Sequence, residues 1–159
     1  ATIPYRLGAR SADVVYVTPH DVEGARAILA EVRAEQEAAG RAAETVHVFA
    51  DLVVFLGDDA ASRKARLDER AGEEYASDAF VFTGTPQGLA DLLLEWQAAG
   101  LSGFRLRPAV LPTDLRAITR GLVPELQQRD AFRRAYEAGT LRGLLGLPRP
   151  ANRYAKAAS

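Results

Sequence analysis

Short apolar runs alternate with longer, more polar stretches along most of the chain. Four runs rich in Val, Phe and Leu are typical of buried β-strands: residues 13–17, 45–56, 79–83 and 103–107. The longer stretches after them predict helices: residues 22–39, 60–71, 86–99 and 115–122. This alternation predicts an α/β fold with four parallel strands joined by right-handed crossovers, followed by a helical C-terminal tail.

The third unit has the clearest end signals. Thr85 follows the strand and can cap the next helix, while Pro86 suits that helix's first position. Gly100 can close the helix. Trp96 falls on its apolar face, so we interpret this side chain as part of the core rather than as a stacking platform for a ligand.

The two ends of the chain have weaker patterns. Pro4 and Gly8 argue against a long regular element in residues 1–11. Thr113 is expected to cap the helix over 115–122. Residues 139–159 form the predicted C-terminal tail of a single domain that spans residues 1–159, since no linker or internal repeat interrupts the chain.

Composition narrows the function classes. The chain has 159 residues, a net charge of −1 and no cysteine. The charge gives no support for a nucleic-acid or anionic-membrane partner, and no apolar run reaches the ~20 residues of a membrane span. Without cysteine, disulfides, zinc–thiolate sites and cysteine nucleophiles are excluded, and a cytoplasmic location is the default expectation. Because the chain starts with Ala, we expect it to begin at a trimmed or processed point.

Thr18 and His20 follow the first predicted strand, where parallel α/β proteins place their functional groups. His20 can act near neutral pH as an acid–base group or contact a cofactor, or it is a solvent-facing loop residue. His47 and Asp51 share one face of the second strand because they are four residues apart. A polar pair in an apolar strand can face a pocket, an interface or water.

Arg105 and Arg107 share a face of the fourth strand. Arg107 lies near the end of the strand, where it can hold a phosphate or carboxylate, but salt bridges to neighbouring acids are the favoured interpretation for both arginines. The turn at 83–85 can present N–H groups to an anion, although a capped turn is the ordinary alternative. Two pairs of adjacent acidic residues, 58–59 and 73–74, have no other potential metal ligands near them in the sequence. We interpret them as solvated residues at helix ends.

An ordered set of short motifs carries a family resemblance: Ala9-Arg10-Ser11-Ala12-Asp13-Val14-Val15, Gly84-Thr85-Pro86, Gly103-Phe104-Arg105-Leu106-Arg107-Pro108, Leu111-Pro112, Val123-Pro124-Glu125-Leu126-Gln127 and Leu145-Gly146-Leu147-Pro148-Arg149-Pro150-Ala151-Asn152. Together they resemble the bacterial luciferase-like flavin-dependent monooxygenases, nearest the branch of nitrilotriacetate and dibenzothiophene-sulfone monooxygenases. The resemblance implies the second half of a TIM-type (β/α)₈ barrel. It also implies reduced FMN, O₂ and a small organic substrate, with a separate flavin reductase as flavin donor.

Thr18, His20 and Arg107 are the candidate cofactor-binding residues under this resemblance, and no catalytic residue is assigned. In the family, most flavin contacts lie in the first half of the barrel, so we expect this chain to be inactive alone. One alternative is a non-catalytic half barrel that self-associates or serves as a binding module, since open strand edges favour a homo-oligomer. Another is a small binder of phosphate ligands that uses Arg107 and the 83–85 turn.

Overall fold

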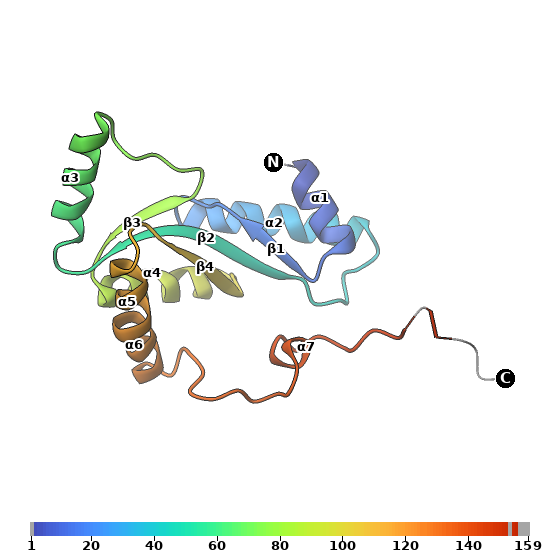
Figure 1. Cartoon of the computed structure of the whole chain (residues 1–159). Coiled ribbons are helices and arrows are strands. Elements are labelled where there is room, and N and C mark those ends of the chain that lie inside the picture. The colour runs from blue at the N-terminus through green and yellow to red at the C-terminus, as the bar shows by residue number, and fades with distance from the viewer. Residues whose placement is uncertain (1, 153, 156–159) are drawn as a thin grey trace.

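Four parallel strands form one open sheet in the computed structural model, which describes residues 2–152 and 154–155 (Figure 1). The strands are β1 (Val14–Val17), β2 (His47–Leu56), β3 (Phe80–Gly84) and β4 (Gly103–Pro108). Helices follow β1, β2, β3 and β4 in turn, so the α/β class with parallel strands alternating with helices is confirmed.

The long strand β2 is the centre of the sheet and pairs with all three others. β1 pairs with residues 47–50 of β2 and β3 pairs with residues 52–56. β4 pairs with residues 49–54, which overlap both stretches, so β4 must lie along the opposite edge of β2. The sheet is therefore three strands wide, with β1 and β3 end to end on one side (Figure 1).

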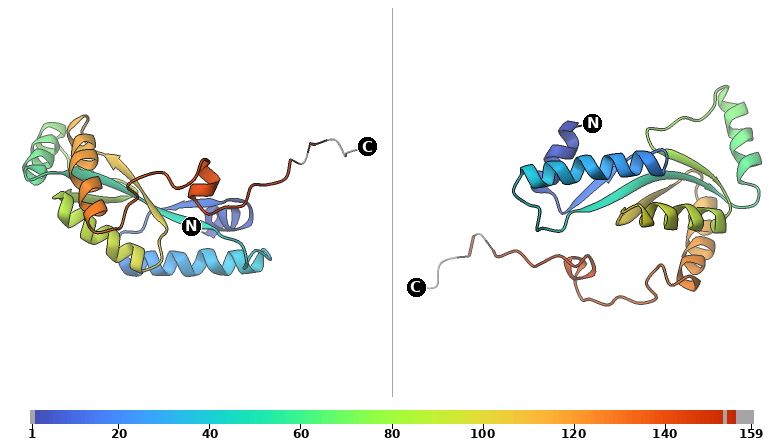
Figure 2. Two further views of the ribbon diagram at one scale, coloured as in Figure 1. Left: turned by 90° about the horizontal axis from the view of Figure 1, so that it is seen from below. Right: turned by 180° about the vertical axis from the view of Figure 1, so that it is seen from behind.

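Two helices cover one face of this sheet. These are α2 (Val22–Ala38) and α4 (Pro86–Ala98), and Figure 2 shows both on the same side, with the C-terminal tail on the other. Their buried side chains, Trp96 of α4 among them, meet the even-numbered residues of β2 in the main core. Thr85 caps α4 as predicted, its Oγ1 accepting a hydrogen bond of 3.2 Å from the Gly88 amide.

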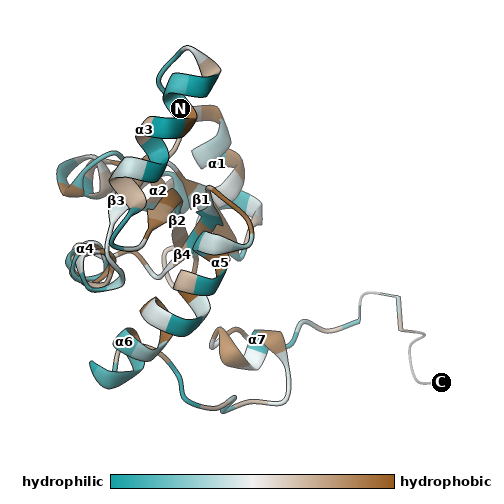
Figure 3. Ribbon diagram, turned by 60° about the vertical axis from the view of Figure 1, so that its left-hand side comes forward, coloured by the Kyte–Doolittle hydropathy of each residue, from teal (hydrophilic) through white to brown (hydrophobic). Residues whose placement is uncertain are grey.

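The opposite face is packed against a longer helix at its carboxyl end. There Val53 and Phe55 of β2 pack with Ala60, the first residue of α3 (Ala60–Ala71). The rest of α3 is largely hydrophilic (Figure 3). The remainder of this face is therefore left to the side chains of the strands and to the tail.

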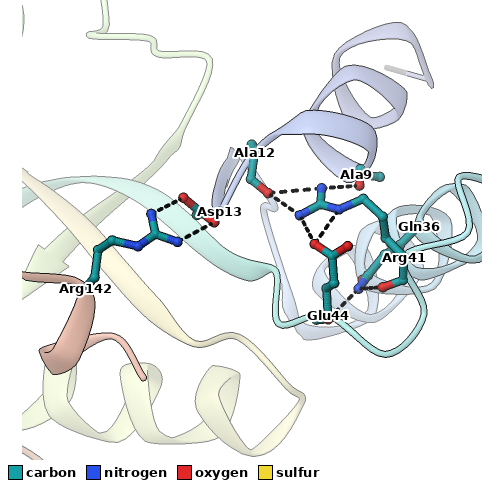
Figure 4. A network of polar contacts seen from close by, with 7 residues as sticks. All are labelled: Ala9, Ala12, Asp13, Gln36, Arg41, Glu44 and Arg142. Atoms are coloured by element: carbon teal, nitrogen blue, oxygen red, sulfur yellow. Dashed lines mark hydrogen bonds and ion pairs between the residues drawn. The ribbon is translucent and has the colours of Figure 1, made fainter. Parts of the chain in front are cut away.

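Residues 2–11 correct one prediction, because they form the helix α1 (Thr2–Ser11). Pro4 lies in the first helical turn, where backbone N–H groups have no intrahelical acceptor, so it costs no hydrogen bond. Gly8 lets α1 approach β1 closely, since a Cβ there would lie 2.7 Å from Val15 Cγ2. Arg41 then donates to the Ala9 carbonyl oxygen at 2.7 Å, which fixes the end of α1 (Figure 4).

The predicted helix over 115–122 is longer and irregular. It runs through α5 (Thr113–Ala117), a π-helical turn η1 (Ile118–Leu122) and α6 (Val123–Gln128). Thr113 lies inside it, and Pro112 holds the N-cap position without a side-chain cap, so the predicted Thr113 cap is wrong. The π turn ends two residues before Pro124 and contains Arg120, whose carbonyl would clash with the proline ring in a regular helix. The wider turn accommodates this proline.

The tail crosses the amino-terminal end of the uncovered face. Its described residues include the short helix α7 (Leu141–Leu144). Arg142 donates to both carboxylate oxygens of Asp13, at 2.7 and 3.3 Å (Figure 4), and this hydrogen bond lowers the pKa of Asp13 against the opposing effect of desolvation. Residue 153 and residues 156–159 of the predicted tail lie outside the described residues, and the single-domain division stays a prediction.

Candidate functional site

The sheet face that α2 and α4 leave uncovered carries the polar candidates of the sequence. Alternation along the strands puts the odd-numbered residues of β2 and β4 on this side. We call the following set the open face: Tyr16 of β1, His47, Phe49 and Asp51 of β2, and Arg105 and Arg107 of β4. The predicted shared faces, of His47 with Asp51 and of Arg105 with Arg107, agree with this arrangement.

Arg105 and Asp51 form the central ion pair of the open face. They are register partners, and the guanidinium donates twice to the carboxylate, with Nε 2.5 Å from Oδ1. Asp51 is buried, whereas the Arg105 side chain is 53% exposed and lies 4.7 Å from the centroid of the Tyr16 ring. The hydrogen bond to Asp51 raises the pKa of Arg105. The pair thus neutralises a buried acid on an otherwise accessible surface.

Arg107 also has partners in its own chain. Its Nη2 lies 3.2 Å from both Ser77 Oγ and Asp78 Oδ1, while its Nε is buried without a hydrogen-bond partner. The hydrogen bond from Arg107 lowers the pKa of Asp78. Both arginines therefore form the salt bridges that the sequence favoured, and a role for Arg107 toward a cofactor stays a prediction.

Thr18, His20 and Arg107 do not meet at one point. Thr18 directly follows β1, whose last residue pairs with Ala50 in the middle of β2. His20 is exposed in the loop before α2. Arg107 pairs with Val53 from the other edge of β2, so the central strand separates it from Thr18. The three predicted cofactor residues remain predictions that the arrangement of the strands does not unite.

His47 and Asp51 share a face but have different partners. His47 Nε2 lies 2.7 Å from the Leu145 carbonyl oxygen in the tail, so the ring holds the tail against the start of β2. Asp51 is committed to Arg105. His47 is therefore an anchor for the tail in this structure, and the two side chains do not act as one acid–base pair.

Sequence reasoning missed a buried carboxylate at the carboxyl end of β2. Asp114 of α5 is fully buried and accepts hydrogen bonds from the amides of Leu56, at 2.9 Å, and Val110, at 2.7 Å. Arg63 of α3 adds a third at 2.6 Å, and a further hydrogen bond from Arg63 lowers the pKa of Asp59. This cluster ties α3, β2 and α5 together. A lone Asp in a polar stretch offered no signal for it.

One member of each acidic pair of the sequence forms an ion pair with α3: Asp59 with Arg63 and Glu74 with Lys64. Lys64 of α3 lies 2.7 Å from Asp68 and 3.2 Å from Glu74. Within residues 2–152 and 154–155, no three His, Asp or Glu side chains gather as a metal ion would require. Among the same residues, no helix is long and apolar enough to cross a membrane.

The open face fits a flavin phosphate incompletely. Phosphate groups in proteins are bound by cations and backbone N–H groups that lack other partners. Both open-face arginines are paired with carboxylates, and the Thr85 hydroxyl accepts from the amide of Gly88 as an ordinary helix cap. The described residues of this face therefore lack a complete phosphate site of their own.

Two of the curated proteins that the chain matches are monooxygenases. It is 44% identical over 77 residues to N-acetyl-S-(2-succino)cysteine monooxygenase of Bacillus subtilis, covering 48% of this chain and 18% of the relative. It is 43% identical over 74 residues to nitrilotriacetate monooxygenase component A of Aminobacter aminovorans, covering 46% and 16%. No family model matches the chain.

Solved structures match much more of the chain. Long-chain alkane monooxygenase superposes with a TM-score of 0.73 at 24% identity, over 89% of this chain and 42% of that one. EDTA monooxygenase from Chelativorans sp. BNC1 gives 0.70 at 25% identity, over 91% and 48%. The chain thus spans less than half the length of the proteins that it matches. The chain is similar to the luciferase-like flavin monooxygenases, the nitrilotriacetate and dibenzothiophene-sulfone monooxygenases among them, and it matches part of such a protein.

Proposed function

We propose that this chain forms part of the barrel wall of a reduced-FMN-dependent monooxygenase and is inactive without the rest of that wall. The open face carries this proposal. In a (β/α)₈ barrel the helices pack outside and the opposite sheet face lines the interior. Here α2 and α4 cover one face, and the other presents Arg105, Asp51 and Tyr16, a mixture of charged and aromatic groups suited to a substrate cavity.

Because the open face lacks a complete phosphate site, the proposed enzyme needs additional strands and helices of the barrel to bind FMN. β4 pairs only with β2 among the described residues, so its outer edge can accept another strand. In the proposed enzyme, residues beyond this chain would supply the cations and backbone N–H groups that bind the FMN phosphate. The bound flavin would supply the oxygen-activating chemistry, a flavin reductase would deliver it reduced, and the substrate would be a small organic molecule.

A hybrid protein tests the proposal. The matching 74-residue segment of nitrilotriacetate monooxygenase component A would be replaced by the corresponding residues of this chain. We expect the hybrid to fold and to consume O₂ with reduced FMN, while this chain alone does not. Catalysis by the isolated chain would contradict its incompleteness, and a folded hybrid without any flavin binding would contradict the monooxygenase assignment.

The second candidate is a non-catalytic half barrel that self-associates. It is favoured by the same unpaired edge of β4, which a second copy can cover. Sedimentation velocity of the isolated chain separates the two proposals. A stable dimer that neither binds flavin nor dissociates on dilution supports the module, whereas a monomer over the micromolar range removes it.

A further inference from the structure

Residues 140–148 of the C-terminal tail, which we call the strap, lie across the amino ends of the strands. The tail leaves α6, at the end of the helical segment that follows β4, and the strap reaches Asp13, the residue before β1. Because β1 and β4 lie on opposite edges of β2, the tail crosses the sheet from one edge to the other. Figure 2 shows it on the face opposite α2 and α4, and Leu147 of the strap is buried.

Two contacts fasten the strap to neighbouring strands. Arg142 donates to both carboxylate oxygens of Asp13. His47 Nε2 donates to the Leu145 carbonyl oxygen at 2.7 Å, since a carbonyl oxygen can only accept. The His47 amide in turn donates to the Asp13 carbonyl oxygen at 2.9 Å, so the two fastening points lie side by side at the start of the β1–β2 ladder. All of these groups belong to this chain, so the fastening requires no contact from the rest of a barrel.

Arg142 both folds the strap and fastens it. Its Nε donates to the Pro148 carbonyl oxygen at 2.7 Å, which closes the strap into a turn, while its two Nη atoms donate to Asp13. Its own carbonyl oxygen accepts from the amides of Leu145, at 3.2 Å, and Leu147, at 2.8 Å. Because the same guanidinium makes the internal and the external hydrogen bonds, its loss should loosen the turn and the attachment together.

We propose that the strap closes the amino-terminal end of the barrel interior and that Arg142 holds it closed. The open face lines the interior of a barrel, and the strap lies over that face at the starts of the strands. Closure of this end leaves the carboxyl end of the strands, where parallel barrels place their sites, as the way into the interior. The part that concerns a barrel rests on the proposed function, whereas the strap and its fastening are tested on this chain alone.

Amide hydrogen exchange tests the role of Arg142. In Arg142→Gln the amides of Leu145 and Leu147 should exchange about three- to tenfold faster, the loss of one half-exposed ion pair and one further hydrogen bond, while residues 52–56 of β2 stay protected. Arg142→Lys keeps the charge but not the forked donors, so its rates should be intermediate. Arg149→Gln is the matched control, because Arg149 is exposed in the same tail and pairs with no acid among the described residues.

Histidine acylation by diethyl pyrocarbonate tests the closure. The chain has two histidines: His47 lies under the strap and His20 is exposed in a loop, so His20 is an internal control. Peptide mass spectrometry should show His47 reacting more slowly than His20 in the wild type, and about three- to tenfold faster in Arg142→Gln with His20 unchanged.

Two results would overturn the proposal: strap exchange rates in Arg142→Gln that match those of Arg149→Gln, or a His47 reactivity that does not respond when the strap loosens. A folded hybrid without flavin binding would contradict the proposed function and leave both measurements on this chain standing.

Discussion

Removal of the Asp114 carboxylate should destabilise the fold more than loss of any surface ion pair. Asp114→Ala deprives the amides of Leu56 and Val110 of their acceptor. It also removes one of the two carboxylate partners of Arg63, whose side chain is only 11% exposed, and leaves Asp59 as the other. Breaking a buried pair from one side costs about 3–5 kcal/mol. At about 2–4 °C per kcal/mol for a chain of this size, the midpoint of thermal unfolding should fall by about 6–20 °C.

Urea unfolding followed by Trp96 fluorescence measures this loss, since Trp96 is the only tryptophan and is buried in the core. Asp91→Ala is the control, because Asp91 pairs with Arg129 while 70% exposed and should change stability by less than about 1 kcal/mol. In the cycle with Arg63→Met, the double variant should lose about 0.5–3 kcal/mol less than the sum of the single losses. Strict additivity, or a cost of Asp114→Ala no larger than the control, would refute the reasoning.

Two further predictions concern the start of β4 and the tail. Gly103→Ala would put a Cβ 2.7 Å from the Phe49 ring and should cost about 1–3 kcal/mol in urea unfolding, whereas Gly139→Ala, with open space around it, should cost almost nothing; equal costs would contradict the close packing. Arg142 lowers the pKa of Asp13 in the folded protein. The ion pair therefore stabilises the attachment of the tail fully at pH values above the unfolded-state pKa of Asp, near 4, and this stabilisation is lost as the pH falls through the lower folded-state pKa. Asp13→Asn should therefore speed amide exchange over residues 141–147 at neutral pH, and wild-type rates there that match the variant at every pH would contradict the link.

Local patterns in the sequence predicted the four strands and the principal helices, because strand burial and helix capping depend on neighbouring residues. Thr85 shows this well, since a short-range cap signal determines where α4 begins. The order of the strands in the sheet could not be predicted in this way. Nothing local shows that β3 and β4 lie on opposite edges of β2, because that depends on which strands the crossovers bring together.

The candidate site shows the same division. Periodicity predicted that Asp51 shares a strand face with His47 and that Arg105 shares one with Arg107. Only the register of β2 with β4 makes Asp51 and Arg105 partners. The α1 helix was missed because Pro4 and Gly8 were weighed as breakers without Val15, which packs against Gly8. Asp114 and Arg63 are 51 residues apart and meet only in the folded chain, so no spacing rule could pair them.

The most direct test of the monooxygenase assignment is a flavin titration of the hybrid in which this chain's residues replace the matching segment of nitrilotriacetate monooxygenase component A. The titration follows flavin fluorescence with oxidised FMN and absorbance with reduced FMN under anaerobic conditions. If the open face is part of a flavin barrel wall, the hybrid binds reduced FMN within about tenfold of the parent enzyme's affinity. A hybrid that is folded by circular dichroism yet shows no saturable flavin binding contradicts that claim.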